Sequence, residues 1–160
     1  MSAGAPYPIR PARAADIPRI AAIVRAAYEK YIPRMGKKPG PMLDDYAARV
    51  AEGAAWVLEA DGGVAGLLVL LPEADHILLD NVAVDPQFAG RGIGRALIEF
   101  AEAETRRRGF AEIRLYTHET MTENIAMYPR LGYEETHRAE QAGYQRVFMR
   151  KKLTPLAGNS

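Results

Sequence analysis

The sequence predicts an α/β (α+β) fold in which a mixed, mainly antiparallel sheet is flanked by helices. Three observations support this prediction. Strand-like and helix-like hydrophobic patterns alternate along the chain, three strand patterns follow one another in its centre, and a long amphipathic helix pattern then stands between two strand patterns. The expected order of elements is β-α-α-β-β-β-α-β-α-β-β. Consecutive strands feeding a single βαβ unit imply a mixed sheet with helices on both faces.

The first third of the chain predicts one strand and two helices. Ile9–Pro11 is a short strand, and Asp16 is the expected N-cap of a helix that Pro33 ends. Residues 32–41 are rich in Pro, Gly and Lys and predict a loop, and Met42–Ala51 predicts a second, weaker helix. The apolar face of the first helix is formed by Ile17, Ile20, Ala21, Val24, Tyr28 and Tyr31.

The centre of the chain predicts three strands. Ala54–Glu59 and Val64–Leu71 flank Asp61-Gly62-Gly63, residue types that accept positive φ in a hairpin turn. The unbroken apolar run of Val64–Leu71 indicates burial on both faces. The third strand, His76–Val84, is interrupted by the polar pair Asp80-Asn81.

Two helices and three strands are expected in the C-terminal half. Gly92–Arg108 is the clearest helix, ended by Gly109, and Thr120-x-x-Glu123 has the form of a capping box that opens a helix to Leu131. The strand patterns cover Ala111–Thr117, Tyr133–Arg138 and Gln145–Lys151.

Composition narrows the function classes. A chain of 160 residues predicts a single domain over 1–160, with a core at about 9–153. The net charge of +1, from 21 Lys and Arg against 20 Asp and Glu, argues against a nucleic-acid partner. The absence of cysteine excludes disulfides, thiolate metal sites and a cysteine nucleophile. The three histidines show no ligand spacing, so no metal is expected.

The N-terminal residues and the hydropathy pattern predict a cytoplasmic protein with no membrane partner. Met1–Arg10 lacks a basic region followed by an apolar segment, which a secretory signal would need. The longest strongly apolar run, Val64–Leu71, is shorter than the roughly 20 residues of a membrane span.

A glycine-rich loop before the long helix is the most informative segment. Gly90, Gly92 and Gly94 leave the backbone N–H groups accessible, the helix N-terminus adds partial positive charge, and Arg91 and Arg95 add full charges. Such a site suits a pyrophosphate; the alternative is a tight turn whose glycines serve packing. No Lys-Ser/Thr pair follows, so the loop is not a P-loop, and Arg95 stands where a dinucleotide fingerprint needs glycine.

This loop resembles the acyl-CoA loop of the GNAT N-acetyltransferase superfamily, whose pattern is Gln/Arg-x-x-Gly-x-Gly/Ala. The pattern falls on residues 89–94, with Ala89 in place of the family's Gln or Arg. The resemblance extends from about Ile9 to Leu153 and includes Tyr128-x-x-x-Gly132-Tyr133. It implies acetyl-CoA as acyl donor. It assigns contacts with this cofactor to Val82, Ala83, Val84, Ala89, Gly90, Arg91, Gly92, Ile93, Gly94, Arg95, Asn124 and Tyr128.

The resemblance also implies catalytic roles. Direct acetyl transfer needs a base for the amine and a proton for the departing thiolate. Tyr128 matches the tyrosine that protonates the thiolate, the alternative being a packing tyrosine. Asp80 and His118 are the candidate bases. Asn124 lies one turn before Tyr128 on the same helical face, whereas the family's asparagine position is held by Met121.

The predicted acceptor is a primary amine, expected on a small molecule. The candidate substrate-binding residues are Tyr28, Tyr31, Arg34, Glu119 and Tyr144. The favoured alternative for Tyr28 and Tyr31 is a purely structural role, in which they complete the apolar stripe of the first helix. Two other functions stay open, a catalytically silent acyl-CoA-binding or sensing module and an RNA- or protein-modifying acetyltransferase. A homodimer through the C-terminal strands also stays open.

Overall fold

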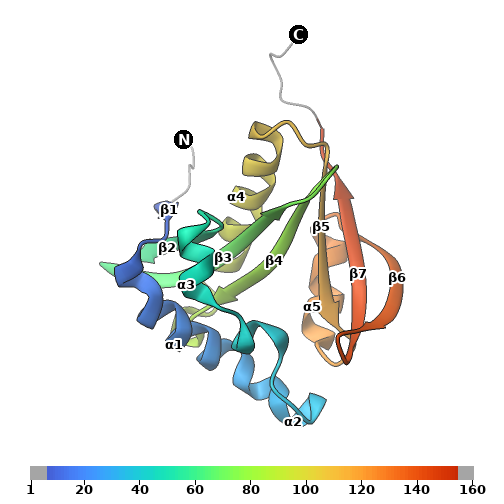
Figure 1. Cartoon of the computed structure of the whole chain (residues 1–160), viewed down its shortest axis with the longest axis horizontal. Helices are drawn as coiled ribbons and strands as arrows, with labels where there is room; N and C mark the ends of the chain where they lie inside the picture. Colours follow the sequence, from blue (N-terminus) through green and yellow to red (C-terminus); the bar gives the residue numbers. More distant parts are fainter. Residues whose placement is uncertain (1–6, 155–160) are drawn as a thin grey trace. The chain divides into compact units, whose positions relative to one another are not determined.

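The computed structural model describes residues 7–154, so residues 1–6 and 155–160 of the predicted domain lie outside the described residues. The predicted order of elements is confirmed, with one extra short helix (α2) after the first (Figure 1). The helices are α1 (Ile17–Tyr28), α2 (Ile32–Met35), α3 (Tyr46–Ala51), α4 (Ile93–Arg107) and α5 (Thr122–Arg130). The strands are β1 (Ile9–Pro11), β2 (Ala55–Ala60), β3 (Gly63–Pro72), β4 (Ile77–Val84), β5 (Glu112–His118), β6 (Glu134–Gln141) and β7 (Tyr144–Lys152).

The seven strands of the described chain follow the hydrogen-bonding order β1-β2-β3-β4-β5-β7-β6. β4 and β5 are parallel, because α4 carries the chain back between them, whereas β1/β2, β2/β3, β5/β7 and β6/β7 are antiparallel. The predicted mixed, mainly antiparallel sheet is therefore confirmed.

The chain divides into two compact units, which we describe separately. The first unit comprises Met1–Leu70 and Asn81–Ala101, and the second comprises Leu71–Asp80 and Glu102–Ser160. β4 therefore contributes residues to both units. The prediction of one domain over 1–160 stays a prediction.

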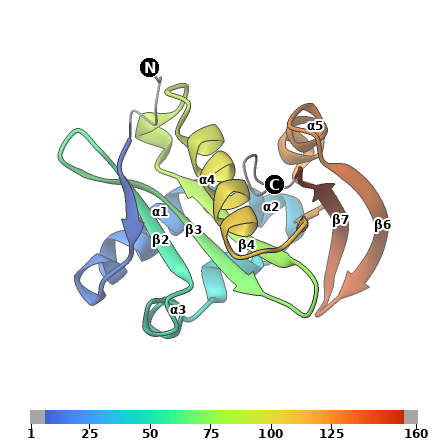
Figure 2. The same cartoon turned by 90° about the horizontal axis from the view of Figure 1, so that it is seen from above.

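In the first unit, α1 and α3 lie on one face of β2 and β3, and α4 lies on the other (Figures 1 and 2). The Trp56 and Phe100 rings pack at 4.9 Å between centroids. A Cβ on Gly66 would come within 3.1 Å of the Ile93 and Leu97 side chains, so glycine permits this close approach of helix and strand. The central residues of β3 are buried on both faces, as its unbroken apolar run predicts.

Two tight hairpins share one backbone geometry. Asp61 and Gly62 join β2 to β3 with φ of 55° and 84°, which confirms the predicted turn. Ala142 and Gly143 join β6 to β7 with φ of 54° and 83°. Two consecutive turn residues with positive φ give the turn a backbone twist that matches the twist of the flanking strands. In the second turn only Gly143 is a residue type that accepts positive φ at little cost, whereas Ala142 is not.

Two predictions for the N-terminal third are wrong. Pro33 does not end the first helix: α1 ends at Tyr28, and Pro33 lies in the first turn of α2, where a missing N–H costs nothing. The second helix covers only Tyr46–Ala51 of the predicted Met42–Ala51, because the Asp45 side chain caps it by accepting a hydrogen bond from the Ala48 N–H.

Asp16 anchors the start of α1. Its carboxylate accepts two hydrogen bonds from Arg10, at 2.8 and 3.0 Å, and one from the Arg13 N–H at 2.7 Å. The Arg10 hydrogen bonds, and secondarily the Arg13 N–H, hold the pKa of Asp16 below its ordinary value against the opposing effect of burial. A carboxylate whose pKa is lower in the folded than in the unfolded state stabilises the fold at pH values above its unfolded-state pKa. This stabilisation is lost as the pH falls through the folded-state pKa.

Asp16→Ala is expected to lower the free energy of unfolding by about 2 kcal/mol at pH 7, because three charge-assisted hydrogen bonds are lost. The difference from the unaltered chain should shrink below about pH 4, where the carboxyl becomes protonated. Urea titrations at several pH values measure both effects. Glu99→Ala, which removes only the exposed partner of Arg95, is the control and should leave stability unchanged. An equal difference at pH 7 and pH 3 would contradict the role of the Asp16 charge.

In the second unit, α5 lies on the face of the sheet from which Thr117 points (Figure 2). The predicted capping box is wrong: α5 begins at Thr122 with Met121 as N-cap, and the Thr120 hydroxyl contacts the His118 ring instead. Gly132 ends α5, as predicted, with φ of 98°. The Tyr133 hydroxyl donates a hydrogen bond to buried Glu102. Burial is the largest cause, and the nearby Glu102 carboxylate the second, of a Tyr133 pKa well above its ordinary value.

Candidate functional site

The loop between β4 and α4 is held in place by Asp85. This carboxylate accepts a hydrogen bond from the Gln87 N–H at 2.9 Å and pairs with Arg19 at 2.5 Å. The hydrogen bond from the Gln87 N–H, and to a lesser extent that from Arg19, keeps the pKa of Asp85 below its ordinary value, although burial of the residue opposes this effect. Asp85 is therefore an anchor of the loop, and its charge is matched within the first unit.

The glycines of this loop adopt the conformation that the motif predicts. Gly90 and Gly92 have φ of 80° and 76°, where a side chain would be strained. α4 begins at Ile93, so the N–H groups of its first turn have no partner inside the helix. These donors and the helix dipole make the turn suitable for an anionic group.

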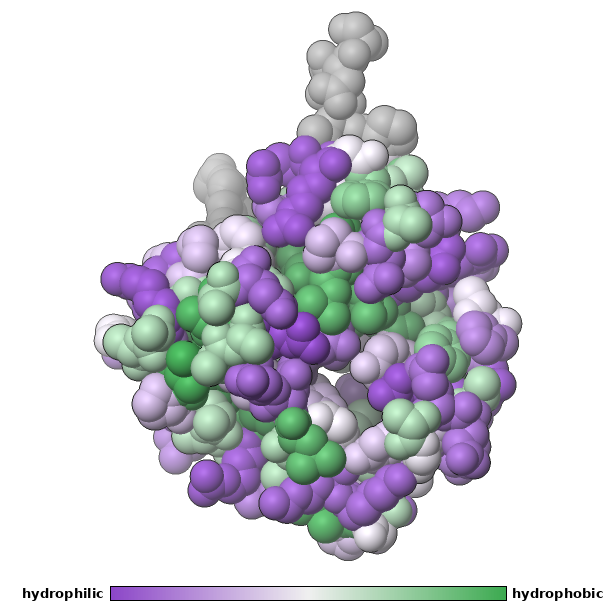
Figure 3. Space-filling model, in the orientation of Figure 1, coloured by the Kyte–Doolittle hydropathy of each residue, from purple (hydrophilic) through white to green (hydrophobic). Residues whose placement is uncertain are grey.

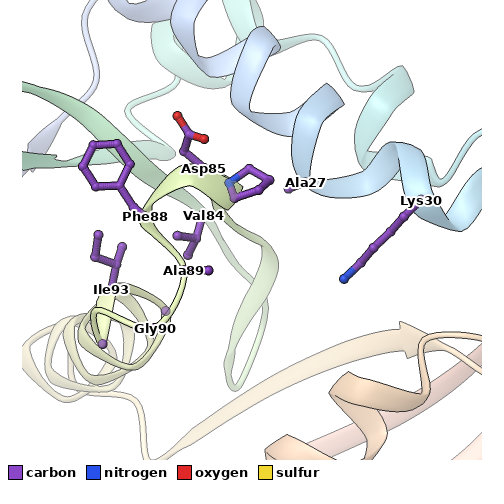
Figure 4. A pocket seen from close by; sticks show the side chains of 11 residues that line it. Ala27, Lys30, Val84, Asp85, Phe88, Ala89, Gly90 and Ile93 are labelled. Atoms are coloured by element: carbon purple, nitrogen blue, oxygen red, sulfur yellow. The ribbon is translucent and has the colours of Figure 1, made fainter.

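A pocket of about 340 Å³ opens at this turn (Figure 4). Glycines, which expose their backbone atoms, and apolar side chains make up much of its lining. The predicted cofactor-binding residues among the lining are Val84, Ala89, Gly90, Gly92, Ile93 and Gly94. The structure thus brings together half of the residues that the sequence predicted for the cofactor.

Lys30 and Phe88 also line this pocket, and neither was predicted. Lys30 extends from the helical turn after α1 with its ammonium group directed toward the pocket (Figure 4). Phe88 lies in the short turn Pro86–Phe88. Lys30 is far from the loop in sequence, so only the packing of α1 reveals that it supplies the pocket's cation.

The two loop arginines do not line the pocket. Arg91 pairs with Asp61 at 2.8 Å and lies over the Phe88 ring. Arg95 pairs with Glu99, one turn further along α4. In this structure each guanidinium group is thus paired with a carboxylate that does not line the pocket, and a role for either arginine in binding the cofactor stays a prediction.

Residues of β4 in the first unit are hydrogen-bonded to α1. The Tyr28 hydroxyl donates to Asn81 Oδ1 at 2.6 Å and lies 3.1 Å from the Val82 carbonyl oxygen. The Asn81 amide in turn donates to the Tyr46 hydroxyl. Ala83 is buried. These contacts favour a structural role for Tyr28 over a role in binding substrate.

Tyr31 and Arg34 lie together after α1. The Tyr31 ring is only 5% exposed, which favours packing over substrate binding. The Arg34 guanidinium is exposed and lies 4.9 Å from the centre of this ring.

Asp80 faces Tyr116 in the second unit. The Tyr116 hydroxyl donates to Asp80 Oδ1 at 3.1 Å, from β5 to β4. The Arg146 guanidinium lies 4.0 Å from the centre of the Tyr116 ring. Neither Tyr116 nor Arg146 was predicted as a site residue, and the only sequence signal was the alternation that sends both to one face of the sheet.

His118 makes local contacts that define its tautomer. Its Nδ1 accepts a hydrogen bond from the Thr120 N–H at 3.1 Å, so in the neutral ring the proton is assigned to Nε2. The Tyr144 ring meets the imidazole edge-on, with centroids 6.1 Å apart. Glu119 is exposed, and its backbone N–H donates to the Gln145 carbonyl. Tyr144 and His118 therefore form a pair at the end of β5.

Tyr128 lies in α5, 8% exposed, with its ring edge-on to Tyr133 at 5.6 Å. Asn124, one turn earlier, donates to the Thr117 hydroxyl at 3.3 Å. Asn124 is thus held against β5, whereas Tyr128 packs on the residue that follows the turn after α5.

The described residues hold neither a metal-binding cluster nor a membrane-spanning helix. Within residues 7–154, no group of three His, Cys, Asp or Glu side chains is arranged to hold a metal ion. None of the helices in this range has the length and apolarity that a membrane crossing requires.

On the face shown in Figure 3, hydrophilic side chains predominate and hydrophobic ones form small patches between them.

Comparisons with solved structures identify the fold. The Escherichia coli ribosomal-protein-S18-alanine N-acetyltransferase superimposes with a TM-score of 0.74 over 96% of this chain and 98% of that chain, at 22% identity. The PaiA N-acetyltransferase of Thermoplasma acidophilum, solved in complex with coenzyme A, gives a TM-score of 0.71 over 92% and 99% of the two chains, at 20% identity.

Sequence comparison identifies the family. The [ribosomal protein bS18]-alanine N-acetyltransferase of Escherichia coli K12 is 35% identical over 78 residues, which cover 49% of this chain and 53% of that protein. The match thus spans about half the length of this curated relative. The Acetyltransferase (GNAT) family matches residues 19–133, a segment that includes the glycine-rich loop and Tyr128. The chain therefore belongs to the GNAT acetyltransferase family.

Proposed function

We propose that this protein is an acetyl-CoA-dependent N-acetyltransferase that moves the acetyl group directly to a primary amine on a small molecule. The observation that carries the proposal is the pocket at the start of α4, where Gly90 and Gly92 adopt positive φ beside the N–H groups of the first helical turn. Membership of the GNAT family supplies the reaction class.

The residues present fit the pyrophosphate and pantetheine portion of acetyl-CoA. The first turn of α4 offers N–H donors, Lys30 offers a cation, and Val84 and Ile93 offer apolar contact. When bound there, acetyl-CoA supplies the activated acetyl group.

Tyr128 and Asp80 are the proposed acid and base. In direct transfer the amine nitrogen bonds to the thioester carbon, the carbon–sulfur bond breaks, the amine loses a proton and the thiolate gains one. We assign the proton of the thiolate to the Tyr128 hydroxyl and acceptance of the amine proton to Asp80. The engagement of His118 Nδ1 by the Thr120 N–H favours Asp80 over His118.

Thermal unfolding with acetyl-CoA and with coenzyme A tests binding, and an amine panel at saturating acetyl-CoA tests turnover. A ligand at 100 times its dissociation constant should stabilise the folded protein by about 2.7 kcal/mol. Absence of any shift with either ligand would refute the proposal. Binding without turnover of any amine would instead support the alternative of a silent acyl-CoA-binding module.

Lys30→Ala is expected to weaken acetyl-CoA binding about fivefold, because one ammonium group at the pocket is lost while the backbone donors remain. The dependence of affinity on salt should also become shallower. Isothermal titration at two ionic strengths measures both effects. Lys152→Ala, an exposed lysine on β7, is the matched control. Equal losses in the two variants would show that Lys30 acts only through net charge.

The terminal α-amine of a protein is the second candidate acceptor. It is favoured by the curated relative named for the alanine of ribosomal protein bS18. A peptide with N-terminal alanine, compared with small amines at saturating acetyl-CoA, separates the two candidates through kcat/KM.

A further inference from the structure

Arg91 belongs to the glycine-rich loop, but its side chain does not line the pocket at the start of α4. It stands between Gly90 and Gly92, which both line that pocket. Its guanidinium group donates two hydrogen bonds to the Asp61 carboxylate, at 2.8 and 3.1 Å. Asp61 lies at the tip of the β2–β3 hairpin, 30 residues away in sequence, and both residues belong to the first unit.

Two further contacts hold Arg91 beside the pocket. Its backbone carbonyl accepts a hydrogen bond from the Tyr7 hydroxyl at 2.9 Å. Its guanidinium group lies over the Phe88 ring, 5.0 Å from the ring centre. Phe88 itself lines the pocket (Figure 4). The guanidinium group therefore lies next to a wall of the pocket, on a side chain with several rotatable bonds.

The ion pair between Arg91 and Asp61 is exposed to solvent. The two side chains are 39% and 63% exposed, respectively. An exposed ion pair contributes little free energy, because water screens the charges and because two flexible side chains must be held in one geometry. Phosphate groups match the planar guanidinium group as well as a carboxylate does and form strong charge-assisted hydrogen bonds with it. Asp61 is therefore a partner that Arg91 can exchange for a phosphate group.

The charges that line the pocket leave room for a second cation. Among the described residues of the lining, Lys30 supplies a cation, and the Asp85 carboxylate is matched by Arg19. The phosphate groups of acetyl-CoA together carry more negative charge than one ammonium group balances. Arg91, whose neighbours in the chain form the lining, is placed to supply the missing charge.

We infer that Asp61 is a positioning residue that competes with acetyl-CoA for Arg91. The carboxylate holds the guanidinium group beside the pocket, and Arg91 exchanges it for a phosphate group when the cofactor binds. Asp61 therefore lowers the affinity for acetyl-CoA, because the ion pair must break before Arg91 can bind the cofactor. This inference rests on the proposed function. In the sequence Asp61 is only a hairpin-turn residue, so its effect on the cofactor follows from the tertiary contact alone.

Asp61→Asn is expected to tighten acetyl-CoA binding about threefold. The loss of an exposed ion pair changes an equilibrium constant by no more than about fivefold, which sets the size of the effect. Asparagine preserves the fold of the hairpin, because it accepts the φ of 55° at this position at least as readily as aspartate does. Isothermal titration of acetyl-CoA into the full chain measures the dissociation constant.

Arg91→Gln provides the second arm of the experiment. It is expected to weaken acetyl-CoA binding about fivefold, because a charge-assisted contact is lost. In this background Asp61→Asn should have no further effect, since the carboxylate acts only through Arg91. Glu52→Gln is the matched control: Glu52 is an exposed carboxylate of the first unit that pairs with a different arginine, Arg49, and its loss should leave the affinity unchanged.

Each outcome decides between explanations. Tighter binding in Asp61→Asn that disappears in the Arg91→Gln background supports the inference. Weaker binding in Asp61→Asn overturns it and makes the ion pair a brace of the loop, and unchanged binding overturns it as well. Equal tightening in both backgrounds also overturns it, because Asp61 then acts only through net charge. If the unaltered chain binds neither acetyl-CoA nor coenzyme A, the proposed function itself fails, and the inference fails with it.

Discussion

Tyr128→Phe is expected to lower kcat by about a hundredfold while the dissociation constant of acetyl-CoA stays unchanged. The reason is that phenylalanine keeps the ring and its edge-on contact with Tyr133 but removes the hydroxyl proposed to protonate the leaving thiolate. A general acid contributes typically 10²- to 10⁴-fold to a rate. Steady-state kinetics with the best amine of the panel, together with calorimetric titration of acetyl-CoA, measures the two quantities separately.

Tyr133→Phe is the matched control for this prediction. Tyr133 is also a buried tyrosine of the second unit, but its hydroxyl donates to Glu102. Its loss should reduce stability by about 1 kcal/mol and leave kcat nearly unchanged. A kcat for Tyr128→Phe within about threefold of the unaltered enzyme would show that Tyr128 is only a packing residue.

Asp80→Asn is expected to lower kcat/KM by about a hundredfold at neutral pH. Asparagine still offers an oxygen to the Tyr116 hydroxyl but cannot take the proton of the amine. Measurement of kcat/KM at pH 7, together with calorimetric titration of acetyl-CoA, separates a loss of the base from a loss of cofactor binding.

His118→Gln is the informative companion to Asp80→Asn. Glutamine can replace the polar contact that His118 makes with Thr120 but cannot act as a base near neutral pH. The expected result is a small loss of activity and an unaltered pH profile. A hundredfold loss in His118→Gln, with Asp80→Asn nearly fully active, would transfer the role of base to His118.

Local patterns predicted the elements of this fold well. The run of apolar residues in β3, the Asp61-Gly62 turn and the amphipathic stripe of α4 each depend on interactions between near neighbours in the chain. The errors also have local causes. Pro33 is compatible with the first turn of a helix as well as with a helix end, and Thr120 hydrogen-bonds to His118 instead of capping α5.

The candidate site was predictable where backbone geometry defines it. The positive φ angles at positions 90 and 92 favour glycine, and the glycines Gly90 and Gly92 can be read directly from the sequence. The charged residues were less predictable, because a long side chain can reach several partners. Arg91 and Arg95 are paired outside the pocket, whereas Lys30, distant in sequence, lines it.

The sequence by itself determined the order of elements, the glycine-rich turn and the position of Tyr128, because each follows from short-range backbone preferences or from spacing along one helix. Tertiary structure decided which polar residues face one another. Asp80 and Asn81 are adjacent in sequence, yet Asn81 bonds with Tyr28 and Tyr46, whereas Asp80 meets Tyr116. Strand alternation sends the two side chains to opposite faces, and only the packing of helices and the register of distant strands selects their partners.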